Sequence, residues 1–87
     1  MASKEGMLKV SVISPEETLF EGEAASVTAP AFDGEVGILP SHAPMVTTLG
    51  AGVLRIGAND ARFQVEGGFM QVVDDMVRVV TERASRL

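Results

Sequence analysis

The sequence predicts an all-β protein, either a sandwich or a flattened barrel. About eight or nine short runs suit extended structure, and residues that favour turns, namely Gly, Pro, Asn and Asp, separate them. Several of these runs alternate apolar and polar residues, and none shows a convincing period of about 3.6 residues. At 87 residues the chain has room for one modest core, so we expect a single domain over residues 1–87, with residues 1–6 as a frayed polar terminus.

The strands expected in the first half of the chain are residues 7–13, 18–21, 24–29, 35–39 and 45–49. In the first of them Leu8, Val10 and Val12 fall on one face, which predicts a half-buried strand. Gly22 is expected to mark a bend or a bulge. Pro30 is expected to stop its strand or to lie at a sheet edge, because proline cannot donate a ladder hydrogen bond.

The strands expected in the second half are residues 53–56, 61–66, 69–73 and 76–81. Residues 57–60 have the length and composition of a hairpin loop, and Asp74–Asp75 of a two-residue turn. Residues 61–66 alternate, which predicts that the odd-numbered side chains point inward. Gly67–Gly68 permits a corner or a close backbone approach. Only residues 82–87 could begin a helix, and that segment is too short to be stable alone.

The most distinctive stretch is residues 34–56, where two prolines frame the single histidine of the chain between short β-branched runs. Pro40 and Pro44 enclose Ser41, His42 and Ala43, a composition that predicts a rigid turn between two strands. A turn of this kind is either a structural corner or a pre-ordered docking surface that loses little entropy on binding. The residues alone leave both interpretations open.

Charge and composition exclude several classes of protein. The chain has a net charge of −5, and its seven basic residues are scattered, which argues against nucleic acid as a partner. It contains no cysteine, which favours a reducing compartment weakly. No apolar run reaches the roughly 20 residues that cross a bilayer, and the first residues lack the apolar core of a signal peptide. We therefore expect a soluble, cytoplasmic protein.

The sequence offers little for catalysis or for a cofactor. His42 has Ser41 beside it, but adjacent residues in a turn do not form a catalytic pair. The acidic pairs Glu16–Glu17 and Asp74–Asp75 fit solvated turns better than a metal site. A carrier domain is disfavoured because the lysines, Lys4 and Lys9, do not lie at hairpin tips. The expectations are therefore no enzyme, no metal and no cofactor.

Three motifs identify a family. Gly-Glu-Val-Gly-Ile-Leu-Pro-Ser-His-Ala-Pro-Met-Val-Thr over residues 34–47 closely resembles the signature of the epsilon subunit of F-type ATP synthase. Residues 52–56 are similar to the Gly-x-x-Arg-Ile strand that follows in that family. Residues 67–72 match its Gly-Gly-Phe-x-Glu-Val element, with Gln71 in place of the usual Glu. The resemblance runs from about Leu8 to Ala84.

The resemblance implies a flattened β-sandwich of about ten strands and a non-catalytic place in the rotor. In that family the domain lies at the foot of the central stalk, between the gamma subunit and the membrane c-ring, and supports coupling of ion flow to ATP synthesis. The implied position is peripheral, on the cytoplasmic face of the bacterial inner membrane. Contact with the membrane is then only indirect, through the complex, and no ATP binding is expected.

The resemblance also implies contact residues. Those expected to face the c-ring are Asp33, Gly34, Glu35 and His42. Those expected to face the gamma subunit are Pro44, Met45, Val46, Thr47, Thr48, Gly67 and Gly68. Within the first set, the resemblance places Glu35 where an acidic residue meets the basic loop of the c subunits, a contact worth about 1 kcal/mol if it stays exposed.

The chain departs from the family at its end. Typical epsilon subunits continue into a helical hairpin that can inhibit ATP hydrolysis, whereas residues 82–87 form only a short tail. We therefore expect a short form without that inhibition. The alternative to a rotor subunit is a free-standing adapter or a small-molecule-binding β module, and an isolated enzyme is the third possibility.

Overall fold

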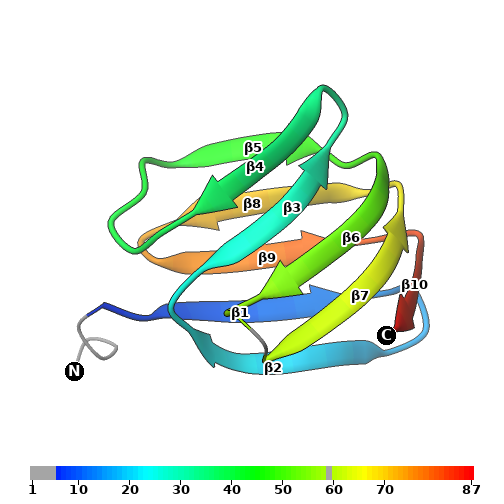
Figure 1. Ribbon diagram of the computed structural model, residues 1–87, viewed down its shortest axis with the longest axis horizontal. Helices are drawn as coiled ribbons and strands as arrows, with labels where there is room; N and C mark the ends of the chain where they lie inside the picture. The colour runs from blue at the N-terminus through cyan, green and yellow to red at the C-terminus, as the bar shows by residue number, and fades with distance from the viewer. Residues whose placement is uncertain (1–5, 59) are drawn as a thin grey trace.

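The computed structural model describes residues 6–58 and 60–87 and confirms the all-β sandwich (Figure 1). Most of the frayed terminus, residues 1–5, and Asn59 of the expected hairpin loop lie outside the described residues. The strands are β1 (Leu8–Ile13), β2 (Thr18–Ala24), β3 (Val27–Ala31), β4 (Gly34–Ile38), β5 (Met45–Thr48), β6 (Ala51–Ile56), β7 (Ala61–Glu66), β8 (Phe69–Val73), β9 (Met76–Val80) and β10 (Arg83–Arg86).

The strands form two five-stranded sheets that pack face to face. Sheet A has the order β2-β1-β9-β8-β5, and sheet B the order β10-β7-β6-β3-β4. In Figure 1 the strands of sheet B run diagonally across those of sheet A. Strands β1 and β9 pair in parallel, and the other strand pairs among the described residues are antiparallel. The chain crosses between the sheets five times, after β2, β4, β5, β7 and β9.

The core lies between the two sheets and is built from one face of each strand. In β7 the odd-numbered residues Ala61, Phe63 and Val65 are buried and the even-numbered residues are exposed, as the sequence predicts. Leu8 and Val12 of β1 are fully buried in the same way. Burying a side chain of this size stabilises the fold by about 1.5 to 3 kcal/mol.

The two predicted hairpins are present with the predicted turns. Ile56 pairs with Ala61 across residues 57–60, and Val73 pairs with Met76 across Asp74–Asp75. Asp74 and Asp75 both have positive φ, 50° and 62°. This is the backbone of a type I′ turn, whose twist matches that of the flanking strands.

The Gly67–Gly68 corner is also confirmed, and it requires glycine. Both residues have positive φ, 72° and 103°. A Cβ atom at Gly68 would overlap the backbone carbonyl oxygen of Val80, so β8 can approach β9 this closely only with glycine at position 68.

The bend expected at Gly22 is wrong, because β2 continues through it from Thr18 to Ala24. Gly22 pairs with Val10, and a Cβ atom there would lie 3.4 Å from the ring of Phe20. The irregularity in this pair of strands occurs between Val12 and Ile13 instead.

Pro30 neither stops its strand nor lies at an edge, so that expectation is also wrong. It is inside β3, paired with Glu35, and β3 lies between β4 and β6. The ladder between β3 and β6 ends at Thr28, so no N–H group is needed at Pro30 on that side. The carbonyl oxygen of Pro30 instead accepts a hydrogen bond from the N–H of Gly50, at 2.8 Å.

Residues 82–87, for which the sequence predicted a short tail without a stable helix, contain a strand that was not expected. Arg83–Arg86 forms strand β10, which pairs antiparallel with β7. The buried Thr81 redirects the chain from sheet A to sheet B: its N–H donates to the carbonyl of Ile13, and its hydroxyl to the carbonyl of Arg83, at 2.9 and 2.8 Å. Pairing with a strand distant in sequence decides this conformation, so the local composition could not reveal it.

Candidate docking surfaces

The described residues hold no group of three or more His, Cys, Asp or Glu side chains that could bind a metal ion. In the same part of the chain no helix is long and apolar enough to cross a membrane. The features that stand out lie on the outer faces of the two sheets and at the ends of the sandwich.

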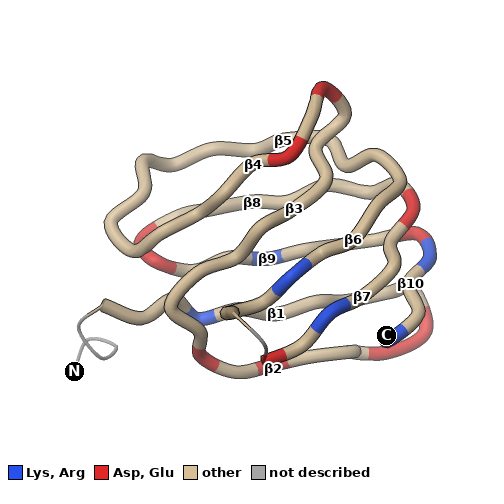
Figure 2. The backbone as a smooth tube through the Cα atoms, in the orientation of Figure 1, with Lys and Arg blue, Asp and Glu red and all other residues tan. Residues whose placement is uncertain are grey.

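The tip of the β3–β4 hairpin brings three of the expected ring-contact residues together. Ala31 pairs with Gly34 across a two-residue turn of Phe32 and Asp33, and Glu35 follows in β4. Gly34 has a φ of 131°, which L side chains rarely adopt. The tip is acidic (Figure 2) and also exposes Phe32, 72% of whose surface is accessible. Phe32 is not among the contact residues expected from the sequence.

His42, the fourth expected ring-contact residue, lies elsewhere. Strand β4 separates the hairpin tip from the loop of residues 39–44, and its length is about 13 Å at 3.3 Å per residue. The Nδ1 atom of His42 is 2.7 Å from the carbonyl oxygen of Ala43, its neighbour. The ring-contact set therefore falls into two separate places on the molecule.

The loop that carries His42 is fastened to the β8–β9 turn. The N–H of Ser41 donates a hydrogen bond to the carboxylate of Asp75, at 2.6 Å, and Ser41 has a φ of 69°. The backbone carbonyl of Asp75 also accepts a hydrogen bond from the N–H of Lys9, at 2.9 Å. Asp75 thus joins three segments of the chain. Its side-chain role could not be found from sequence, because the two bonded residues are 34 positions apart.

Glu35 has a partner within the domain. Its carboxylate lies 3.9 Å from the guanidinium of Arg55 on β6, and the two side chains are 61% and 47% exposed. At this distance and exposure the ion pair is weak. Glu35 can therefore interact with a cation of a partner, but that cation would compete with Arg55 for the Glu35 carboxylate.

The outer face of sheet A exposes several apolar side chains on β5, β8 and β9, which surround the polar pair Gln71 and Arg78. Val46, Phe69, Val73 and Met76 expose 67%, 42%, 40% and 58% of their surface, and the strand registers place them on one face of these neighbouring strands. We call these four residues the apolar face. Over β1 and β2 the same side of the sheet carries polar residues, among them Ser11. Large apolar side chains exposed on neighbouring strands, with polar residues among them, are a feature of docking surfaces.

The residues expected to face the gamma subunit divide over this region. Val46 and Thr48 are exposed on the outer side of β5, whereas Met45 and Thr47 are only partly exposed and pair with buried residues of β8. The remaining members are at its borders: Pro44 is exposed before β5, and Gly67 and Gly68 lead into β8.

Phe69, Val73 and Met76 were not in the expected set. For Phe69 and Val73 the signal is that β8, Phe-Met-Gln-Val-Val, places apolar residues on both faces instead of alternating.

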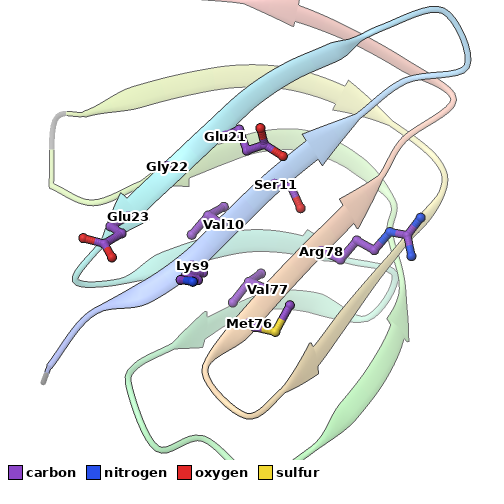
Figure 3. Close-up of a pocket in the computed structure, with 9 residues that line it drawn as sticks. All are labelled: Lys9, Val10, Ser11, Glu21, Gly22, Glu23, Met76, Val77 and Arg78. Atoms are coloured by element: carbon purple, nitrogen blue, oxygen red, sulfur yellow. The ribbon is translucent and has the colours of Figure 1, made fainter. Parts of the chain in front are cut away.

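A shallow hollow of about 420 Å³ adjoins the apolar face (Figure 3). Its floor contains the backbone at Gly22, Val10 and Val77, whose valine side chains are buried on the other side of the sheet. The side chains that line it come from β2, β1 and β9 and are Glu21, Glu23, Lys9, Ser11, Met76 and Arg78.

The fold and its exposed side chains define a β-sandwich domain whose candidate sites are docking surfaces on its outer faces and hairpin tips. The model of the family described as ATP synthase, Delta/Epsilon chain, beta-sandwich domain matches residues 7–87. The chain is therefore a member of the ATP synthase delta/epsilon chain family, and these residues form its β-sandwich domain.

Curated relatives agree with this assignment. The ATP synthase epsilon chain of Leptospira borgpetersenii is 49% identical over 80 residues, which cover 90% of this chain and 63% of the relative. The epsilon chain of Rhodopirellula baltica is 46% identical over 79 residues, 88% of this chain and 62% of the relative. The chain thus spans somewhat less than two thirds of the length of these relatives.

Solved structures share the fold at low identity. A chain in the Euglena gracilis mitochondrial ATP synthase structure that contains OSCP, F1 and the c-ring has a TM-score of 0.85 and 22% identity, covering 98% of this chain and 56% of that one. A chain in the central stalk and c-ring structure of the Tetrahymena thermophila mitochondrial ATP synthase has a TM-score of 0.77 and 15% identity, covering 98% and 69%.

Proposed function

We propose that this domain is a non-catalytic rotor element that joins the gamma subunit of the central stalk to the membrane c-ring. The observation that carries the proposal is the apolar face of sheet A, found on a member of the delta/epsilon chain family. Leaving four large apolar side chains in water is unfavourable, so the face is best explained by a partner that covers it. The stalk and ring subunits named with the structural relatives supply candidate partners.

The gamma subunit is the partner proposed for the apolar face. Val46 and Thr48 of the expected set lie on it or beside it, and Pro44, Gly67 and Gly68 border it. Met45 and Thr47 would support the contact from the inner side of β5 and not touch gamma directly. The hollow beside Met76 would receive one side chain of the gamma surface.

The c-ring is the partner proposed for the tip of the β3–β4 hairpin. Asp33, Gly34 and Glu35 would contact the basic loops of the ring. The basic side chains of the ring would replace part of the interaction between Glu35 and Arg55. His42 would join this contact only where the ring surface extends along β4 to the loop of residues 39–44.

In the complex, the domain would be peripheral on the cytoplasmic face of the bacterial inner membrane and would support coupling of proton or sodium flow to ATP synthesis. It would need no cofactor and would not bind ATP. Inhibition of hydrolysis is assigned by the family resemblance to a helical hairpin. The described residues contain no helix, so we expect none from this domain.

The proposal is tested by calorimetry of the 87-residue protein with its cognate gamma subunit. We expect a one-to-one complex that Val46→Glu or Phe69→Glu weakens at least about tenfold, because each change buries a charge at an apolar contact. Thr18→Glu, which adds the same charge at an exposed position of β2, at the edge of sheet A opposite β5, is the matched control and should leave the affinity unchanged.

Other outcomes separate the candidates. A wild-type protein that does not bind gamma would favour the adapter function. For the ring, a Glu35→Cys variant should cross-link to a cysteine placed in the c loop, and His42→Cys tests the second location. A lack of cross-linking at position 35 would remove the hairpin tip from the ring contact.

A further inference from the structure

Two arginines lie directly opposite each other on the outer face of sheet B. Arg55 of β6 pairs with Arg62 of β7, and both side chains are exposed. Figure 2 shows the two basic positions side by side on these strands. Directly opposed side chains have Cβ atoms about 5 Å apart, and like charges at such positions repel. The free domain therefore has an unfavourable charge pair on an exposed sheet, near the end of the β6–β7 hairpin.

The surroundings compensate for this pair only in part. Arg55 has the weak contact with Glu35 at 3.9 Å, and the described residues provide no ion pair to Arg62. The neighbouring positions Thr28, Val53 and Gln64 are uncharged, and the exposed Asp60, two positions before Arg62 at the end of the hairpin, makes no ion pair with it within 4.0 Å. Yet the chain as a whole carries a net charge of −5, so the pair is a local basic spot on an acidic protein.

We propose that Arg55 and Arg62 together dock an acidic segment of a partner protein that approaches the outer face of sheet B. A guanidinium group presents a planar fork of N–H donors that matches a carboxylate, and two adjacent forks match one or two carboxylates. A bound carboxylate also removes the repulsion between the arginines. Binding of an acidic segment would therefore relieve the electrostatic repulsion that is present in the free domain.

The charge around the pair favours a protein segment over an extended polyanion. Glu35 lies to one side of the pair, and Glu66 lies at the far end of β7. A membrane of anionic lipid or a nucleic acid would bring many negative charges against these carboxylates, whereas a short acidic segment would not. The apolar face lies on the other sheet, so this partner can be present together with the one on sheet A.

Carbodiimide cross-linking identifies the partner directly. This reagent joins an amine to a carboxylate in contact with it, so the Arg62→Lys variant, assembled in the ATP synthase complex, should become linked to an Asp or Glu of another subunit. Arg83→Lys is the control, because Arg83 lies 3.9 Å from Glu66 of its own chain and should link within it. Links from position 62 only to the domain's own carboxylates would overturn the proposal.

Binding measurements test the energetic part. The double variant Arg55→Gln with Arg62→Gln should bind the soluble motor that lacks this subunit about threefold to tenfold more weakly at low salt, whereas Arg83→Gln should not. Its thermal stability should be unchanged or higher, because a repulsion is removed.

The outcomes also separate this inference from the proposed function. Wild-type protein that fails to bind the motor would contradict the rotor function itself. Equal binding by wild-type protein and the double variant would contradict only this inference. Arginine-dependent binding to vesicles of anionic lipid, without a protein cross-link, would overturn the assignment to a protein partner.

Discussion

Gly68 shows how one residue fixes the approach of two strands, since any Cβ atom there would overlap the carbonyl oxygen of Val80. We predict that Gly68→Ala lowers the free energy of unfolding by about 2 to 4 kcal/mol, from this overlap and from its φ of 103°. Gly37→Ala is the matched control, because that position has open space and an ordinary φ. It should be neutral or slightly stabilising. Urea unfolding of both variants provides the measurement, and equal stabilities would contradict the prediction.

The ion pair between Glu35 and Arg55 decides how free the hairpin tip is to bind. Because both side chains are about half exposed, we predict a coupling free energy below about 0.5 kcal/mol in a double-mutant cycle of Glu35→Gln and Arg55→Gln. The cycle is measured by chemical denaturation at low salt. A coupling above about 1.5 kcal/mol would mean that Glu35 is committed within the domain and is a poor ring contact.

The sequence allowed residues to be assigned to strands, but it did not show which residues distant in sequence lie close together in space. Glu35 and His42 are seven positions apart in one motif, which suggested one contact, yet β4 runs between them and separates them in space. The bond from Ser41 to Asp75 and the pairing of Arg55 with Arg62 depend on tertiary structure in the same way. Alternation along a strand reports on its faces and not on its neighbours.

Among the elements, the β8–β9 turn has a second role as the anchor of the loop of residues 39–44. We predict that Asp75→Gly lowers the free energy of unfolding by about 0.5 to 1.5 kcal/mol more than Asp74→Gly does. Glycine relieves the positive φ equally at both positions, and only Asp75 bonds the N–H of Ser41. Thermal and urea unfolding test this. If the two variants are equally stable, the bond does not hold the loop.

The elements predicted well are those with local turn signals. The hairpins around residues 57–60 and Asp74–Asp75 have their turn chemistry in the sequence, so their registers could be predicted. Strand β10 could not be, because its conformation comes from β7 and from Thr81. At Gly22 a local signal gave a wrong prediction. A glycine commonly interrupts a strand, but here the ring of Phe20 lies next to Gly22 and the ladder of β2 with β1 continues.

On the scale of the whole molecule, the two outer faces differ in chemistry. Sheet A presents mainly apolar side chains over β5, β8 and β9, with Gln71 and Arg78 among them, whereas sheet B presents the arginine pair and, in β4, Glu35. Binding to an apolar face is driven mainly by removal of surface from water, and binding to exposed charges is screened by salt. The two faces can therefore be distinguished by how each interaction responds to conditions.

This difference leads to a prediction for the complex with gamma. If the apolar face carries the contact, raising the salt concentration from about 50 to about 500 mM should change the affinity less than about threefold. The heat-capacity change on binding should be negative, because apolar area is buried. Calorimetry at two salt concentrations and several temperatures measures both, with Val46→Glu as the variant that should reduce both the affinity and the heat-capacity change. A tenfold or greater loss of affinity with salt would show that charged residues carry the contact, and gamma would then belong on the arginine pair or the hairpin tip instead of the apolar face.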